Sequence, residues 1–323
     1  MKFLFNIRDI SVYRSELMGW SILWIMMLHF TFNQINLLGF IAQYGFAGVD
    51  IFMLVSGLGM YFSLNQHNNI MQFYKKRLLR IFPTYYLLGI LSSLLLYHDS
   101  IEGYLFRYST IGFWVGEKYW GWYIPSIIML YFLSPFAKFA FDKRKFVTLF
   151  LVCISILLIS YYLIDKDLII DRSHFFFLYR IPSFILGMFC AYCIKNNPST
   201  KYYFAFLLVG IPAFVYFFPQ HHIVYNFKYF SLLFLVPLFT LVFIMISKNI
   251  TFINPILKKI GNASLEIYLI QSIFFHAIII NMIIIPSRWH DLITVALILL
   301  CCILGIAIHW VIDHNALFRF FRF

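Results

Sequence analysis

The chain has 323 residues, of which 62% are hydrophobic and only 12% are charged. Its mean hydropathy of +0.83 excludes an ordinary soluble domain. The formal charge of +12 is spread over short joints between apolar runs, which argues against a nucleic-acid partner and favours contact with anionic lipid headgroups. The composition therefore predicts an all-α, polytopic membrane protein embedded in a lipid bilayer.

Apolar runs long enough to cross a hydrocarbon core of about 30 Å recur along the chain. The sequence contains no internal repeat, low-complexity tract or linker, so we expect one integral-membrane domain over 1–323, with no fused extracytoplasmic domain. The predicted helices number about ten and lie at 17–36, 45–64, 81–97, 121–138, 146–164, 181–194, 202–218, 230–247, 262–285 and 292–312.

The basic residues predict the orientation of this bundle. With the N-terminus in the cytoplasm, alternate loops place most of the 25 Lys and Arg residues on the cytoplasmic side, where the C-terminus is also expected. No small-residue cleavage site follows the first apolar run, so the first helix is expected to be retained. The abundance of Phe, Ile, Asn, Tyr and Lys fits an AT-rich bacterial genome, and we expect a multi-pass protein of the bacterial cytoplasmic membrane.

His29 and Asp50 are ionisable residues within the first two predicted helices. A charged residue such as Asp at membrane depth costs roughly 2.5–3.5 kcal/mol on insertion scales, so such residues usually face the bundle interior and serve a function. The rise per residue places both at similar depths on antiparallel helices. We expect Asp50 to accept a hydrogen bond from one imidazole nitrogen, which leaves the other as a base. In the alternative, His29 bonds a backbone carbonyl and Asp50 caps its helix.

A basic run, FYKKRLLR, occupies 73–80 on the predicted cytoplasmic side. Arg77 and Arg80 are three residues apart and share a helical face, and paired guanidinium groups bind phosphate oxygens bidentately. Together with Lys76, they predict a site for the phosphates of a cytoplasmic donor. The alternative is that the run only anchors the topology.

Three later segments hold further candidates. Trp120, Trp122 and Tyr123 gather at the outer mouth of the fourth helix, either as interfacial aromatic residues or as a stacking platform for a sugar. Arg180, at the outer start of the sixth helix, could face an acidic or hydroxyl-bearing acceptor or a headgroup phosphate. Glu266, one turn into the ninth helix, could help to hold a cofactor or be a water-exposed interfacial carboxylate.

Several of these motifs resemble the integral-membrane acyltransferase 3 family. The first three helices of that family are similar to LMGWSILWIMMLHF (17–30), GFAGVDIFMLVSGLGM (45–60) and FYKKRLLRIFPTYY (73–86). Weaker similarities follow in the family's order at WGWYIPSIIMLYFLSP (120–135), YRIPSFILGMF (179–189) and IGNASLEIYLIQS (260–272).

The resemblance implies an O-acyltransferase that moves an acetyl group from cytoplasmic acetyl-CoA to hydroxyls of cell-surface glycans. It implies His29 as the catalytic histidine, Asp50 as a nearby carboxylate, and Arg77 and Arg80 as contacts for the cofactor phosphates.

The sequence departs from the family pattern at two positions. Met18 stands where the family has an arginine, and Arg14, one turn earlier on the same face, is expected to supply this cation. Gln271 stands where the family has a histidine, and it can form hydrogen bonds to a substrate but cannot carry a proton at neutral pH.

We therefore expect a membrane O-acetyltransferase that uses acetyl-CoA and no metal, and that acts on a cell-surface or capsular glycan or its lipid-linked precursor. Direct transfer and a covalent relay through His29 both stay open, as does a homodimeric state. The main alternative is a proton-coupled transporter or flippase of lipid-linked sugars. A polysaccharide polymerase would need a large outer loop, and the predicted outer loops are short.

Overall fold

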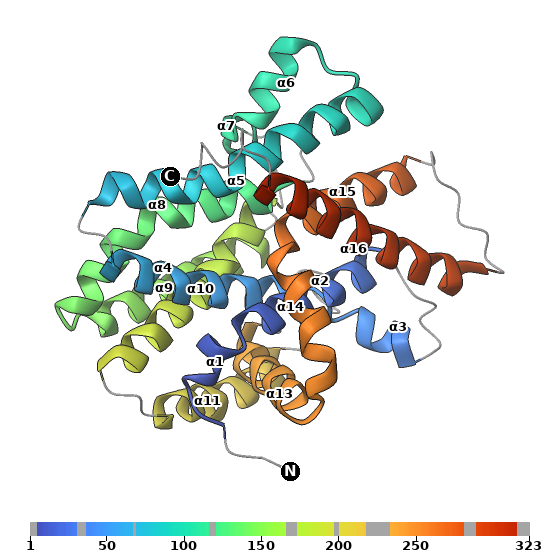
Figure 1. The fold of residues 1–323 in the computed structure, drawn as a ribbon. Helices are drawn as coiled ribbons and strands as arrows, with labels where there is room; N and C mark the ends of the chain where they lie inside the picture. Colours follow the sequence, from blue (N-terminus) through green and yellow to red (C-terminus); the bar gives the residue numbers. More distant parts are fainter. Residues whose placement is uncertain are drawn as a thin grey trace.

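The computed structural model describes residues 5–30, 37–66, 69–115, 121–165, 173–196, 200–217, 233–280 and 289–314. These residues form helices joined by short turns, with no strand in any of the described ranges (Figure 1). The predicted all-α class is confirmed. Trp120 lies outside the described residues.

Each predicted helix range overlaps a helix of the structure, and several short helices were not predicted. In chain order the elements are α1 (Asp9–Val12), α2 (Arg14–His29), α3 (Leu37–Ala42), α4 (Ala47–Gln66), α5 (Ile70–Ser92), η1 (Ser93–Tyr97), α6 (Ile101–Tyr108), α7 (Ile111–Trp114), α8 (Tyr123–Asp142), α9 (Phe146–Asp165), α10 (Ser173–Asn196), α11 (Lys201–Phe217), η3 (Leu233–Leu235), α13 (Val236–Asn249), η4 (Thr251–Ile253), α14 (Asn254–Asn262), α15 (Ser264–Ile279) and α16 (His290–His314).

Part of the predicted set of membrane-spanning helices is found in the structure. Within the described residues, five are long and apolar enough, or six if a pair bent by 97° counts as one span. The predicted count of about ten is therefore not confirmed, because several apolar helices are too short to meet the same test. The five are Ala47–Gln66, Ile70–Tyr97, Tyr123–Asp142, Phe176–Asn196 and His290–His314.

Helix α4 is the most buried of these spans and runs beside α10 (Figure 1). The two backbones touch at two glycines. A Cβ atom on Gly57 would lie 2.0 Å from the carbonyl oxygen of Phe184, and one on Gly187 would lie 1.9 Å from that of Leu54. Small residues allow this close approach between apolar helices, so the pair forms a rigid centre for the bundle.

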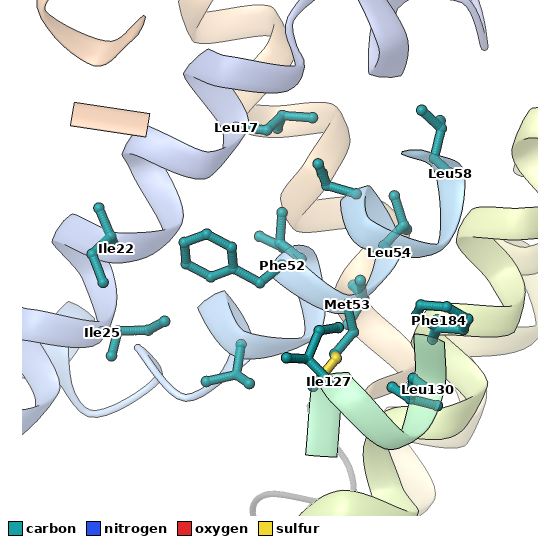
Figure 2. Close-up of a cluster of buried hydrophobic side chains, with 14 of the residues drawn as sticks. Leu17, Ile22, Ile25, Phe52, Met53, Leu54, Leu58, Ile127, Leu130 and Phe184 are labelled. Carbon is teal, nitrogen blue, oxygen red and sulfur yellow. The ribbon is translucent and has the colours of Figure 1, made fainter. Parts of the chain in front are cut away.

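Figure 2 shows the core that α4 builds with its neighbours, where side chains from α2, α4, α8 and α10 converge. Leu17 of α2, Leu54 of α4, Ile127 of α8 and Phe184 of α10 all have exposed fractions of 2% or less. Because this core joins α2 to helices from the middle of the chain, it fixes the relative positions of the helices that line the functional cavity.

Two local features shape one end of the bundle. The sequence predicted a helix that begins at residue 81, after the basic run. Helix α5 begins earlier, at Ile70, with Asn69 as its N-cap, so the basic run lies within the helix. The chain also bends by 97° between α13 and α14. Helix α14 packs against α2. A Cβ atom on Gly261 would lie 1.9 Å from the carbonyl oxygen of Ser15, so the end of α14 is held next to the start of α2.

Candidate active site

A cavity of about 460 Å³ lies between α2, α4, α5, α8, α15, α16 and the end of α14. Its lining changes from charged at one end of these helices to aromatic and aliphatic toward the other. The charged and polar lining residues are Arg14, Ser15, Ser56, Arg77, Arg80, Asn262, Ser264, His309 and Asp313. The aromatic and aliphatic ones are Met18, Ile25, Val49, Phe52, Ile81, Tyr123, Ile124, Ile127, Tyr131, Leu265 and Tyr268.

Three arginines line the charged end, one from the start of α2 and two from α5. The Nε atoms of Arg14 and Arg77 are buried and have no hydrogen-bond partner among the described residues. Gly59 of α4 makes room for the first of these guanidinium groups, because a Cβ atom there would lie 3.2 Å from Arg14 Nη2. A buried donor without a partner is costly, so this end of the cavity suits an anionic ligand.

Arg80 differs from the other two arginines because it has a carboxylate partner. Its Nη1 atom donates to Glu266 Oε1 at 2.8 Å, and its Nη2 atom donates to the carbonyl oxygen of Asn262 at 3.2 Å. Glu266 is fully buried, so it is not the water-exposed carboxylate of the alternative interpretation. It contacts Arg80 rather than lining the cavity itself.

Lys76 is exposed and does not line the cavity. It lies on the outer side of the helix that presents Arg77 and Arg80 to the cavity. Any contact between Lys76 and a ligand inside the cavity therefore stays a prediction without structural support.

His29 lies one turn beyond Ile25 on α2, and its partner Gln271 lies one turn beyond Tyr268 on α15. The Nδ1 atom of His29 is 2.9 Å from Gln271 Oε1. Because an amide oxygen only accepts, this contact is a hydrogen bond in the tautomer that carries the proton on Nδ1, and that tautomer leaves a lone pair on Nε2. The imidazole ring also stacks on Phe275, with centroids 4.6 Å apart. Neither His29 nor Gln271 lines the cavity itself, and each lies one helical turn from a residue that does.

Asp50 does not form the predicted hydrogen bond with His29. Its carboxylate instead accepts hydrogen bonds from Arg180 and, at 2.9 Å, from the hydroxyl of Ser183. The reason is the close packing of α4 against α10, which turns this carboxylate toward α10. A direct role for Asp50 in catalysis stays a prediction.

Arg180 was predicted to face an acceptor or a lipid headgroup, but the structure buries it completely. Its guanidinium group pairs with Asp50 and lies over the ring of Phe46, 4.2 Å from the centroid. A contact between Arg180 and an acceptor stays a prediction, and it would require this packing to open.

The predicted aromatic platform is divided between two places. Tyr123 lines the cavity, with its ring 5.2 Å from that of Tyr268. Trp122 packs against Phe176 at 5.6 Å and does not line the cavity. Tyr123 is therefore the described member of the predicted platform that is placed to meet a ligand.

Two cavity residues on α16, His309 and Asp313, were not predicted from the sequence. They are four residues apart in an otherwise strongly apolar helix and so share a face. Ionisable residues within an apolar span are the signal that could have identified them, because such residues seldom face lipid.

The described residues include no group of three or more His, Cys, Asp or Glu side chains arranged to hold a metal ion. The arrangement is instead a charged pocket joined to an apolar channel with an oriented imidazole beside its far end. Such a cavity can bind an anionic head and direct an attached chain toward a base.

Comparison with known proteins identifies one family. A family model described as an acyltransferase domain matches residues 17–314, which include the cavity-lining residues except those before Leu17. Neither the curated proteins nor the solved structures gave a significant match.

Proposed function

We propose, from the premise that this chain belongs to the acyltransferase 3 family, that it is a membrane O-acetyltransferase that uses acetyl-CoA. The acceptor we propose is a hydroxyl group of a cell-surface or capsular glycan or of its lipid-linked precursor. The single observation that carries this proposal is the cavity, which three arginines line at one end. Its other end is lined by Ile25 and Tyr268, which lie one helical turn before His29 and Gln271 respectively.

The charged end fits the phosphates of coenzyme A. Arg14 and Arg77 each hold a buried Nε–H without a partner among the described residues, and phosphate oxygens would satisfy both. The volume of about 460 Å³ falls within the ordinary range of small-molecule pockets. Acetyl-CoA would supply an activated acetyl thioester.

His29 is the proposed base. With Nδ1–H bonded to Gln271, the Nε2 atom is left to take the proton from an acceptor hydroxyl as its oxygen bonds to the acetyl carbon and the carbon–sulfur bond breaks. The imidazolium then returns this proton to the departing sulfur. Gln271 thus orients the ring in the position where we had expected a carboxylate to do so.

The rings of Tyr123 and Tyr268 support an acceptor site at the apolar end, because aromatic faces stack on the apolar faces of sugars. In this arrangement the donor enters from the cytoplasmic side and the acceptor from the outer half of a bacterial inner membrane. The positive charge at the donor end agrees with that orientation.

The proposal is tested by the release of free thiol from acetyl-CoA by the full chain in nanodiscs, with and without a glycan acceptor. We expect acceptor-dependent release that falls roughly 10²- to 10⁴-fold in His29→Ala, because a general base contributes about that factor. His290→Ala, which changes a partly exposed histidine at the start of α16, is the matched control and should keep wild-type activity.

Full activity in His29→Ala would refute the assignment of the base. A wild-type protein that moves lipid-linked sugars without consuming acetyl-CoA would instead support the transporter alternative. Rapid-quench samples without acceptor separate direct transfer from a relay, because only the relay accumulates an acetylated histidine.

A further inference from the structure

The side chains of His309 and Asp313 connect α16 to Arg80, the cavity arginine that pairs with Glu266. Asp313 Oδ2 lies 3.4 Å from His309 Nε2, and His309 Nδ1 lies 3.2 Å from Glu266 Oε1. Glu266 in turn binds Arg80. Carboxylates therefore face both nitrogens of the imidazole, which restricts the rotation of the ring. We call Asp313, His309 and Glu266 the positioning group.

The positioning group acts on a carboxylate that cannot reach water. Glu266 is fully buried, and a buried charge is tolerated only when it is paired and hydrogen-bonded. Its Oε1 atom meets Arg80 at 2.8 Å, His309 at 3.2 Å and the hydroxyl of Thr84 at 3.4 Å. Removal of the imidazole would take away one of these partners and loosen the carboxylate on which the arginine is held.

Arg80 is constrained on several sides by these contacts. Besides Glu266, its Nη2 atom donates to the carbonyl oxygen of Asn262 at 3.2 Å. His309 Nδ1 lies 3.3 Å from the same Nη2 atom, and when it donates to Glu266 it holds Arg80 through that carboxylate rather than directly. The planar guanidinium group presents its donors in a fixed fork, so its orientation decides whether they can match a phosphate. Arg14 and Arg77, by contrast, have buried Nε atoms without a partner among the described residues.

We infer that His309 and Asp313 are positioning residues for acyl-donor binding, which act through Glu266 to fix Arg80 toward the donor phosphates. This inference rests on the proposed function and extends it to α16, whose role the sequence did not indicate. His309 need not touch the donor or the reacting atoms for this role. Its substitution should therefore change donor affinity and leave the chemical step nearly unchanged.

The test compares His309→Ala with the wild-type chain in nanodiscs, by calorimetric binding of coenzyme A and by steady-state kinetics with acetyl-CoA. We expect the Kd for coenzyme A and the KM for acetyl-CoA to rise together, by roughly threefold to tenfold, because one hydrogen-bonding partner is lost. The kcat should change less than twofold. His314→Ala is the matched control, since the contacts of His314 among the described residues are to Trp310 in its own helix, through the carbonyl oxygen and the ring.

Two conservative variants keep the test decisive if His309→Ala is not recovered folded. His309→Asn introduces an amide that can donate to Glu266, so this variant should bind coenzyme A more tightly than His309→Ala. If His309→Ala is not recovered, the Kd of His309→Asn should lie within threefold of the wild-type Kd. Asp313→Asn should raise the Kd by roughly twofold to threefold, because it weakens the contact between Asp313 and His309, the one farthest from Arg80 in the positioning group.

The possible failures are distinguishable. If the wild type binds coenzyme A and releases thiol while His309→Ala and Asp313→Asn keep wild-type Kd and KM, the inference is wrong and the proposed function stands. A fall in kcat at unchanged Kd would also overturn it, because that result belongs to a residue of the chemical step. If the wild type neither binds coenzyme A nor consumes acetyl-CoA, the proposed function fails first.

Discussion

Two buried carboxylates, Glu266 and Asp50, each pair with an arginine, but the two ion pairs lie in different surroundings. Arg80 keeps 34% of its side chain exposed and lines the cavity, whereas Arg180 has no exposed surface and lies over Phe46. The first pair belongs to a group of polar side chains around a ligand-sized space. The second is enclosed where α4 and α10 pack most closely.

An ion pair inside a membrane bundle is therefore evidence of a functional site only when the pair also contacts a cavity. The sequence predicted a phosphate site at Arg80, and this residue lines the cavity. The sequence also predicted that Asp50 meets His29 and that Arg180 faces an acceptor or a headgroup, but these two residues pair with each other away from the cavity. In Arg180, Nε and Nη2 have no hydrogen-bond partner among the described residues, so its burial depends strongly on Asp50.

The largest expected effect comes from breaking the enclosed pair. Asp50→Leu should destabilise the fold by roughly 3–5 kcal/mol, because it leaves the guanidinium group of Arg180 buried without a counter-charge. Thermal unfolding in detergent, followed by size-exclusion chromatography, measures the loss. The double variant Asp50→Leu with Arg180→Met should recover most of the stability, and failure of this recovery would contradict a mainly structural role for the pair.

Neutralising the open pair should affect binding rather than folding. In the double variant Arg80→Gln with Glu266→Gln, no unpaired charge is buried, so we expect a folded protein. Its Kd for coenzyme A should rise roughly 10- to 100-fold, because one charge-assisted contact to phosphate is lost. Calorimetry gives the Kd and thermal unfolding checks the fold. A wild-type Kd would show that the open pair is as structural as the enclosed one.

A smaller effect is expected at Gln271, which lies beyond the open pair on α15. Gln271→Ala removes the acceptor for His29 Nδ1–H and should lower kcat by roughly fivefold to tenfold, the value of one hydrogen bond. The Kd for coenzyme A should stay at the wild-type value, because the arginines are unchanged. Steady-state kinetics with saturating donor separates the two quantities, and an unchanged kcat would argue against an orienting role.

The smallest effect is expected at Lys76, the exposed member of the basic run. Lys76→Ala should change the Kd for coenzyme A less than twofold, because exposed charges contribute roughly 0–1 kcal/mol and are screened by salt. Binding at two salt concentrations measures this. A tenfold loss would mean that the charged end of the cavity extends to the outer side of α5.

The sequence predicted much of the helical architecture, because apolar runs and their basic joints report directly on burial in a membrane. It also predicted that Arg77 and Arg80 share a face, which follows from helical spacing alone, and both line the cavity. These features depend on local periodicity. They do not require knowledge of which helices are neighbours.

The failures concern packing between distant segments. Equal depth on sequential helices suggested that His29 and Asp50 would meet. The Asp50 carboxylate instead accepts hydrogen bonds from side chains of α10, which lies more than a hundred residues later in the chain. Likewise, nothing local in α15 indicates that Glu266 would bind His309 on α16. The predicted count of about ten spans is not confirmed either, since apolar character alone does not reveal where a helix ends.

The break at Ala263 between α14 and α15 has a consequence for the carboxylate that holds Arg80. A new helix starts there, with Ser264 and Leu265 on the cavity wall and Glu266 in its first turn. The first amide groups of a helix carry a partial positive charge, which favours an acidic side chain in that turn. The backbone of α15 thus helps to stabilise the Glu266 carboxylate without the dehydration cost of another ionised side chain.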